Sequence, residues 1–277
     1  MTASTGTTPG RPLLELDDVT VNFGGVKALS ALTFAVDQGD VVALVGPNGA
    51  GKTTTLNAIG GLIRRNLTGR VTLDGHAIHH LTAAEVARLR IARSFQHPPL
   101  LDKETVLENV MLGANLRQGY GLLDQYVRWG KVRRAESSLL SDAYDNLRLL
   151  GIESSAQKFA GSVPYAVSKL ADIARALLMR PRLLLLDEPT SGLGSGERAI
   201  VVEAISRIRE AREITVVLVE HHMEMVREVA DVVVGLQAGT AVKVGTPSEV
   251  LDAAEFRVAL VGRRNEVVGA VPAPEQG

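Results

Sequence analysis

The sequence predicts an α/β fold with a mixed, largely parallel sheet at its core. Two observations support this fold class. Short continuous apolar runs are typical of strands buried on both faces of a parallel sheet, and helical patterns lie between these runs along the chain. The strand-like runs are VVALV (41–45), LLLLD (183–187), TVVLV (215–219) and DVVVGL (231–236).

The segments between these runs have the length and the apolar spacing of helices that cover a sheet. They are TTTLNAIGGLI (53–63), ERAIVVEAISRIREA (197–211) and HMEMVREVA (222–230). After the last strand-like run, AGTAVKVGTPSEVL (238–251) predicts a final hairpin strand and a helix that begins at a proline.

Two further regions differ from this core. LLELDDVTVNF (13–23) and ALTFAVDQGD (31–40) have the β-branched, partly alternating pattern of antiparallel strands. They predict an antiparallel β-subdomain at the N-terminus. Between about 98 and 180 the apolar residues recur every three or four positions and no convincing strand occurs. We therefore expect a helical subdomain inserted in the core.

The predicted organisation is a single domain over 13–262. Residues 1–12 and 263–277 are polar or rich in proline and small residues, so we expect flexible tails there. A length of 277 residues is sufficient for one large domain with a proper core.

The composition excludes several classes of function. The net charge is −1, so the chain has no general basic field for nucleic acid, and we expect no nucleic-acid partner. The absence of cysteine excludes disulfides, zinc–thiolate sites and thiol catalysis. The longest apolar runs are strand-sized, well short of the roughly 20 residues that span a bilayer. We expect no direct membrane insertion.

GPNGAGKTT (46–54) fits the phosphate-binding pattern G-x-x-x-x-G-K-[ST] directly after a predicted strand and at the start of a predicted helix. Glycines allow backbone N–H groups to wrap phosphates, and the helix N-terminus adds its positive end. We expect Lys52 to bridge the β- and γ-phosphates and the Thr53 hydroxyl to bind Mg²⁺. The candidate phosphate-binding residues are Gly46, Pro47, Asn48, Gly49, Ala50, Gly51, Lys52, Thr53 and Thr54.

Two carboxylates end the apolar run at 183–187. Asp187 lies at the carboxyl end of a buried strand, where it is well placed to reach Mg²⁺ directly or through water. Glu188 follows it, and we expect this residue to polarise the attacking water as a general base. The P-loop and these carboxylates therefore predict a site for a nucleotide with Mg²⁺.

Four motifs together resemble a known family. GPNGAGKTT, RSFQHPPLL, LLLLDEPTSGL and VEHHM occur in the order and spacing of the ATPase subunits of ABC transporters, and the resemblance covers about residues 13–262. FGGVKAL, IARSFQHPPLLDKETVLENVMLG, PYxxxKLADIARAL and GTPSEVL, together with a lengthened middle, resemble the branched-chain amino-acid importers of that family. The resemblance implies a P-loop NTPase fold and ATP hydrolysis coupled to transport.

The resemblance also implies roles for three further residues. Phe23 resembles the aromatic side chain that stacks on adenine, although a lone phenylalanine is more often part of a core. Gln96 resembles the glutamine that contacts Mg²⁺ or water and links the core to the helical subdomain. His221 resembles the histidine that contacts the γ-phosphate, and His222 beside it is interpreted as a helix-start residue.

Two motifs depart from the family pattern. In this family each ATP lies between one subunit's P-loop and the other subunit's signature segment, which here is 163–167 and supplies Pro164, Tyr165 and Ala166 to the partner's ATP. Ala166 replaces a glycine, and its methyl group is expected either to push the partner's phosphate away or to be tolerated. Gly194 stands where a carboxylate or amide is usual, which removes a hydrogen bond across the dimer. These departures suggest two unequal ATP sites.

The implied partners are a second ATPase subunit, identical or paralogous, two transmembrane permease subunits and, indirectly, an extracytoplasmic substrate-binding protein. The implied location is cytoplasmic, peripheral on the inner face of the cell membrane. Alternatives are a regulatory nucleotide-binding subunit with weak turnover, an importer of urea or short amides, and a soluble ABC protein of translation or DNA repair. The single P-loop and the near-zero charge count against the last of these.

Overall fold

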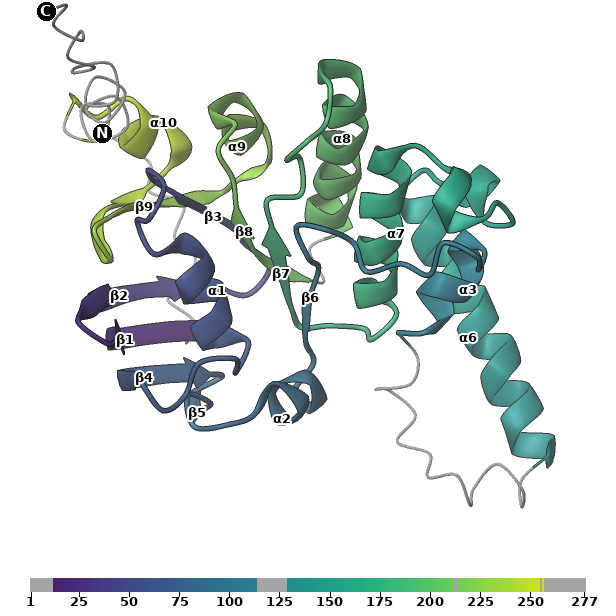
Figure 1. Ribbon diagram of the computed structural model, residues 1–277, viewed down its shortest axis with the longest axis horizontal. Coiled ribbons are helices and arrows are strands. Elements are labelled where there is room, and N and C mark those ends of the chain that lie inside the picture. The colour runs from purple at the N-terminus through teal and green to yellow at the C-terminus, as the bar shows by residue number, and fades with distance from the viewer. Residues whose placement is uncertain (1–11, 114–128, 212–213, 255, 257–277) are drawn as a thin grey trace, which may run out of the picture.

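The computed structural model describes residues 12–113, 129–211, 214–254 and 256. The predicted tails, apart from Pro12, and much of the lengthened middle lie outside these residues. The described chain forms two sheets, with helices around the larger one and a helical region at one side (Figure 1).

The larger sheet has six strands in the order β10-β9-β3-β8-β7-β6. All neighbouring pairs are parallel except β9 with β10, which form the predicted final hairpin. Its strands are β3 (Val41–Val45), β6 (Ile91–Arg93), β7 (Leu183–Asp187), β8 (Thr215–Val219), β9 (Val232–Gln237) and β10 (Thr240–Gly245). The residues of β3, β7 and β8 are all buried, as their continuous apolar runs predict.

The smaller sheet is antiparallel and has the order β2-β1-β4-β5. It consists of β1 (Leu14–Phe23), β2 (Val26–Val36), β4 (Leu67–Leu73) and β5 (His76–Ala77). Helix α1 (Lys52–Ile59) lies between the two sheets in Figure 1. The antiparallel subdomain predicted from the N-terminal sequence is therefore present, and it also includes two strands that follow the P-loop helix.

The remaining helices begin at recognisable signals. Three short ones start at a threonine whose side chain exchanges hydrogen bonds with a glutamate three residues later. They are α2 (Ala83–Arg88), α3 (Val106–Met111) and α10 (Pro247–Leu251), and the last has the predicted proline in its first turn. The longer ones are α6 (Trp129–Leu149), α7 (Tyr165–Leu177), α8 (Ser195–Ala211) and α9 (Met223–Val229).

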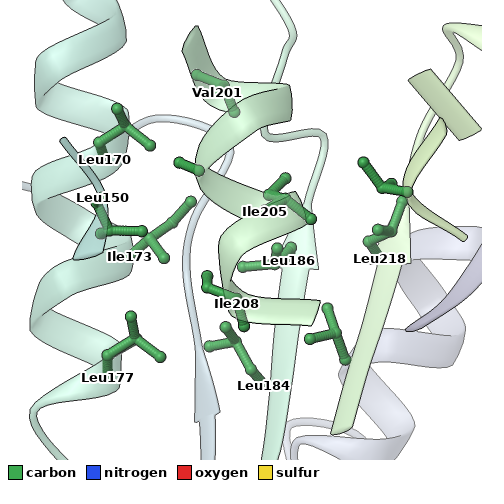
Figure 2. Packing of buried hydrophobic residues seen from close by; sticks show 14 of the residues in the cluster. Leu150, Leu170, Ile173, Leu177, Leu184, Leu186, Val201, Ile205, Ile208 and Leu218 are labelled. Carbon is green, nitrogen blue, oxygen red and sulfur yellow. The ribbon is translucent and has the colours of Figure 1, made fainter. Parts of the chain in front are cut away.

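Within 98–113 and 129–180, the structure contains helices and two short 3₁₀ turns but no named strand, as the spacing of apolar residues predicts. Helices α3, α6 and α7 gather on the side of the molecule away from the antiparallel sheet (Figure 1). Helix α7 joins this group to the sheet, because Leu170, Ile173 and Leu177 face helix α8, whose Ile205 packs over β7 (Figure 2).

Candidate functional site

The chain turns from β3 into α1 through the predicted phosphate-binding loop. A Cβ atom at Gly46 would lie 2.2 Å from the carbonyl oxygen of Leu236, so only glycine fits beside β9. Gly51 adopts φ 102° at the N-cap of α1, a conformation that L side chains rarely take. These two glycines shape a loop whose backbone faces an open pocket.

Lys52 lies at the start of α1 and is buried. Its Nζ atom donates hydrogen bonds to the carbonyl oxygens of Gly46 (2.8 Å) and Pro47 (2.9 Å). Burial lowers the pKa of the Lys52 ammonium below its ordinary value of 10.5, and the charges of Glu188 and Asp187 oppose that shift. The loop's own carbonyls thus hold the ammonium group beside the pocket.

The pocket at this loop has a volume of about 390 Å³, in the usual range for a small-molecule or cofactor site. The loop supplies one wall, β2 supplies a second, and two residues that follow strands of the larger sheet supply a third. The lining residues are Val26, Lys27, Ala28, Asn48, Gly49, Ala50, Gly51, Lys52, Thr53, Thr54, Glu188 and His221. The structure thus brings Glu188 and His221 to the predicted P-loop.

The carboxylate of Glu188 lies between two predicted partners. Gln96 Nε2 donates to Glu188 Oε2 (2.8 Å), and His221 Nε2 lies 2.7 Å from Glu188 Oε1. Glu188 itself has a positive φ of 48°, an uncommon conformation for a residue with a side chain. The three residues named as catalytic candidates are therefore in direct contact, although they are far apart in the sequence.

Asp187 is held by an arginine. Arg93 Nη2 donates to Asp187 Oδ2 (2.7 Å), and Arg93 Nη1 donates to the side-chain oxygen of Asn57 in α1 (2.6 Å). The Arg93 guanidinium also lies 5.8 Å from the centre of the Phe95 ring. One cation at the end of β6 therefore fixes the carboxylate at the end of β7 relative to the P-loop helix.

A buried carboxylate, Glu220, organises the loop that carries His221. It accepts hydrogen bonds from the backbone N–H and the hydroxyl of Thr190 and from the backbone N–H groups of His221 and His222. Burial raises the pKa of Glu220, but the hydrogen bonds outweigh burial and leave the pKa below its ordinary value of 4.5. His222 is the N-cap of α9, as interpreted from the sequence.

The structure does not bring Phe23 to the walls of the P-loop pocket. Phe23 is 46% exposed and lines a separate hollow of about 260 Å³ with residues 62–66. Val26, Lys27 and Ala28 from the same hairpin line the P-loop pocket instead. The expected stacking of Phe23 on adenine stays a prediction.

The signature segment forms the start of α7. Pro164 is the N-cap, Tyr165 is exposed, and the Tyr165 hydroxyl donates to the backbone oxygen of Gln96 (3.2 Å). Ala166 is only 2% exposed and belongs to the main hydrophobic cluster. The side chain therefore packs in the chain's own core, which supports the alternative that alanine is tolerated here, and its effect on a partner's ATP stays a prediction.

Gly194 lies at the surface before α8. Its backbone N–H donates to Glu197 Oε2 (3.3 Å), and its carbonyl accepts from the backbone N–H of Arg198. A Cβ atom at this position would meet only the Glu197 carboxylate, at 3.9 Å. A carboxylate or amide side chain would therefore fit here, so no local steric demand accounts for the glycine.

Three residues of this site were missed by reasoning from the sequence. Arg93 lies in a three-residue strand, and Lys169 lies on the buried side of α7, where its Nζ atom donates to the backbone oxygens of Gln96 and Glu188 (3.0 Å each). Glu220 was visible as the residue before His221, but its burial was not. For Lys169, the sequence offered one signal, which is a charged residue inside an otherwise apolar helical pattern.

Comparison with known proteins then decides the family. A sequence model of the ABC transporter family matches residues 29–191, more than half of the chain. The chain belongs to the ABC transporter family. It is an ATP-binding subunit that hydrolyses ATP, and the P-loop NTPase fold expected from its sequence is confirmed. No helix in the described ranges is long and apolar enough to cross a membrane.

Individual ABC proteins resemble this subunit over nearly its whole length. The high-affinity branched-chain amino acid transport ATP-binding protein BraF of Pseudomonas aeruginosa is 32% identical over 252 residues, which is 91% of this chain and 98% of BraF. The LivG protein of the same description from Escherichia coli K12 is 31% identical over 240 residues, 87% of this chain and 94% of LivG.

Two solved structures of ABC cassettes are also similar. A nucleotide-free ATP-binding cassette has a TM-score of 0.75 and 27% identity, and the match covers 89% of this chain and 98% of that one. The ADP conformation of the cassette MJ1267 has a TM-score of 0.77 and 26% identity, with 92% and 100% covered.

Proposed function

We propose that this subunit energises the import of branched-chain or other hydrophobic amino acids by hydrolysing Mg·ATP. The observation that supports it best is the carboxylate of Glu188, which lies at the wall of the P-loop pocket and contacts both Gln96 and His221. The amino-acid substrate class comes from the similarity to BraF and LivG, which extends over nearly the full length of both.

In the proposed reaction, residues of this chain first bind ATP and then assist the attack of water. The N–H groups of the P-loop and the Lys52 ammonium bind the phosphates of ATP, with Thr53 and Thr54 at the start of α1. The oxygen of a water molecule attacks the γ-phosphorus while the bond from that phosphorus to the β-phosphate oxygen breaks. Glu188 takes the proton from the water, and the products are ADP and phosphate.

His221 and Gln96 keep Glu188 in place for this step. Each contact occupies one carboxylate oxygen of Glu188, and each oxygen keeps a further lone pair that can accept a hydrogen bond from the attacking water. The family resemblance implies that His221 also contacts the γ-phosphate. The proposed base is therefore held between two side chains and can still bind the water.

The residues present fit a magnesium ion. Thr53 offers a hydroxyl, Asp187 a carboxylate and Gln96 an amide oxygen, and these are the oxygen ligands that Mg²⁺ prefers. When bound, Mg²⁺ would neutralise charge that builds up on the transferred phosphoryl group. Asp187 is already oriented by Arg93, so this chain fixes the position of its carboxylate independently of the ion.

The proposed assembly contains a second ATPase subunit, two transmembrane permease subunits and an extracytoplasmic binding protein. The exposed residues Pro164 and Tyr165 at the start of α7 would meet the ATP bound to the partner's P-loop, with Ala166 as the covered residue behind them. Because its methyl group is buried, Ala166 no longer argues for a weakly hydrolysing regulatory subunit. The subunit itself would lie on the cytoplasmic side, against the permeases.

Substitution of Glu188 by Gln tests the hydrolytic part of this proposal. We expect ATP turnover to fall at least about 100-fold because the base is lost, while the dissociation constant for ATP changes little. Steady-state phosphate release and equilibrium binding of a fluorescent ATP analogue measure the two quantities. Glu224→Gln, on the exposed side of α9, is the control. Equal turnover in wild type and Glu188→Gln would refute ATP hydrolysis through this base.

The amino-acid specificity needs a separate measurement. The chain, co-purified with its membrane subunits and placed in lipid vesicles, should support ATP-dependent uptake of labelled leucine that depends on the binding protein. Labelled urea and acetamide distinguish the competing substrates. Uptake of urea without leucine would contradict the amino-acid assignment while leaving the role of an ABC importer intact.

A further inference from the structure

Lys169 is a charged residue in an apolar setting. It lies in the second turn of α7 and is only 3% exposed, among the helical residues that pack against the sheet. Burial lowers the pKa of its ammonium group, and the carboxylates of Glu220, Glu188, Asp172 and Asp187 oppose that shift. Removing an ammonium group from water is costly, whereas an apolar side chain would fill the same space without that cost.

The hydrogen bonds of Lys169 explain what compensates this cost. Its Nζ atom donates to the backbone oxygen of Gln96 and to the backbone oxygen of Glu188, each at 3.0 Å. These are the backbones of the two residues whose side chains bond to each other at the pocket. A single ammonium group therefore ties together the main chains of the proposed general base and of the glutamine that contacts it.

The backbone conformation of Glu188 depends on surrounding contacts, and the hydrogen bond from Lys169 is one of them. The φ of 48° at Glu188 is uncommon for a residue with a side chain, and such conformations persist only where the surroundings hold them. The N–H of Glu188 donates to Val219 in β8, and its carbonyl accepts from Ser191 N–H and from Lys169. Of these three contacts, the one with Lys169 is made by an element outside the sheet and its adjoining loop.

Helix α7 also carries the residues that face the other subunit. The ring of Tyr165 lies 5.3 Å from Lys169 Nζ, and its hydroxyl donates to the same Gln96 oxygen that Lys169 contacts. A shift of α7 relative to the sheet must therefore move the Glu188 and Gln96 carbonyls or break their hydrogen bonds. The exposed start of α7 is therefore connected by hydrogen bonds to the general base of this chain's own site.

We infer that Lys169 is a positioning residue for ATP hydrolysis, which links the position of α7 to the placement of Glu188 and Gln96. This inference rests on the proposed hydrolytic function. It predicts that contact between α7 and a partner's nucleotide is transmitted to this chain's own general base. Lys169 touches neither the P-loop nor the proposed position of ATP, so its effect falls on turnover and not on nucleotide binding.

Replacement of Lys169 by Met tests the inference in the full-length chain. We expect kcat to fall at least about 10-fold, because misplacement of a catalytic group by about 1 Å can cost 100-fold. KM and the dissociation constant of fluorescent ATP should stay within about 2-fold of wild type. Lys169→Arg keeps a cation with several donors and should recover at least about a third of wild-type kcat. Lys169→Gln, a shorter polar side chain, serves if the Met variant does not fold.

The matched control is Lys158→Met, the same substitution at an exposed lysine of the helical region. The side-chain ammonium that bonds to the backbone oxygens of Gln96 and Glu188 is that of Lys169, so the control leaves these contacts intact. Its kcat should stay within about 3-fold of wild type. Unchanged kcat in Lys169→Met, or an equal loss in Lys158→Met, would overturn the inference while wild-type turnover still supported the proposed function. If wild type hydrolyses no faster than Glu188→Gln, the proposed function itself fails.

Discussion

The interpretation of Ala166 depends on the direction in which its Cβ atom points. In the sequence, an alanine in place of a glycine suggests an obstacle to the partner's phosphate. In the structure the methyl group lies in the core of its own subunit, and Pro164 and Tyr165 form the exposed start of α7. The substitution therefore lies in the packing beneath the helix, and we predict that it leaves the surface proposed to meet a partner unchanged.

Replacement of Ala166 by Gly should change ATP turnover by less than about 3-fold, because the removed methyl group faces away from the partner. The variant should be less stable by roughly 0.5–1 kcal/mol, since glycine in a helix loses more chain entropy on folding. Steady-state ATPase activity and urea unfolding measure the two effects. A large gain of turnover would show instead that the methyl group weakens the partner's site.

At the scale of elements, the loops after β6, β7 and β8 meet at one edge of the sheet. Strand β6 leads to Gln96, β7 to Glu188 and β8 to His221, and parallel strands bring their carboxyl ends together. Buried cations and carboxylates then fix these loops to one another. Lys169 joins the first two loops, and Glu220 joins Thr190 to the backbone around His221.

The hydrogen bonds to Glu220 predict a specific pH dependence. Its folded-state pKa lies below 4.5, so its contribution to stability is present above pH 4.5 and is lost as the pH falls through the folded-state pKa. Glu220→Gln should lower the free energy of unfolding by about 1–3 kcal/mol at pH 7, because an amide cannot accept all four hydrogen bonds. The difference from wild type should be equal at pH 7 and 5 and smaller at pH 4.

Urea unfolding of wild type and Glu220→Gln at the three pH values measures this difference. Glu224→Gln, an exposed substitution on α9, is the control and should stay within about 0.5 kcal/mol of wild type. A difference that widens at pH 4 would contradict the prediction, because it would mean that the carboxyl group of Glu220 stabilises the fold in its protonated form.

At the scale of the whole molecule, one apolar cluster joins the helical region to the parallel sheet. Helix α7 packs against α8, and α8 packs over β7 and β8, as Figure 2 shows for Ile173, Ile205 and Leu186. The helical region and one face of the parallel sheet therefore share this cluster, while the other face packs in a second cluster with the antiparallel sheet. A change in this core should affect the stability of the whole described fold and leave the local chemistry of the P-loop intact.

Ile205→Ala tests this description. Ile205 is fully buried in the middle of α8, and its truncation should lower the free energy of unfolding by about 2–5 kcal/mol. Affinity for ATP should be unchanged under conditions where the variant is folded. Ile200→Ala, on the same helix but 47% exposed, should cost less than about 0.5 kcal/mol. Similar losses in the two variants would contradict the assigned packing.

The sequence by itself determined the fold class, the P-loop, the two neighbouring carboxylates at the end of β7 and the family. These features depend on local pattern: continuous apolar runs for buried strands, and glycines with a lysine at fixed spacing for a phosphate loop. Gln96 and His221 were also found from short motifs, and the structure places both against Glu188. The short strands β5 and β6 left no comparable local pattern.

Only the tertiary structure decided which way these side chains point, which of them are buried and which distant residues they contact. The inward direction of the Ala166 side chain, the separate hollow beside Phe23 and the burial of Glu220 depend on which elements pack together, and no local pattern records that. The same holds for Arg93 and Lys169, whose partners lie on other elements. Hydrogen bonds between distant segments form only once the core has packed, so the way this chain holds its candidate catalytic residues is a property of the packed molecule.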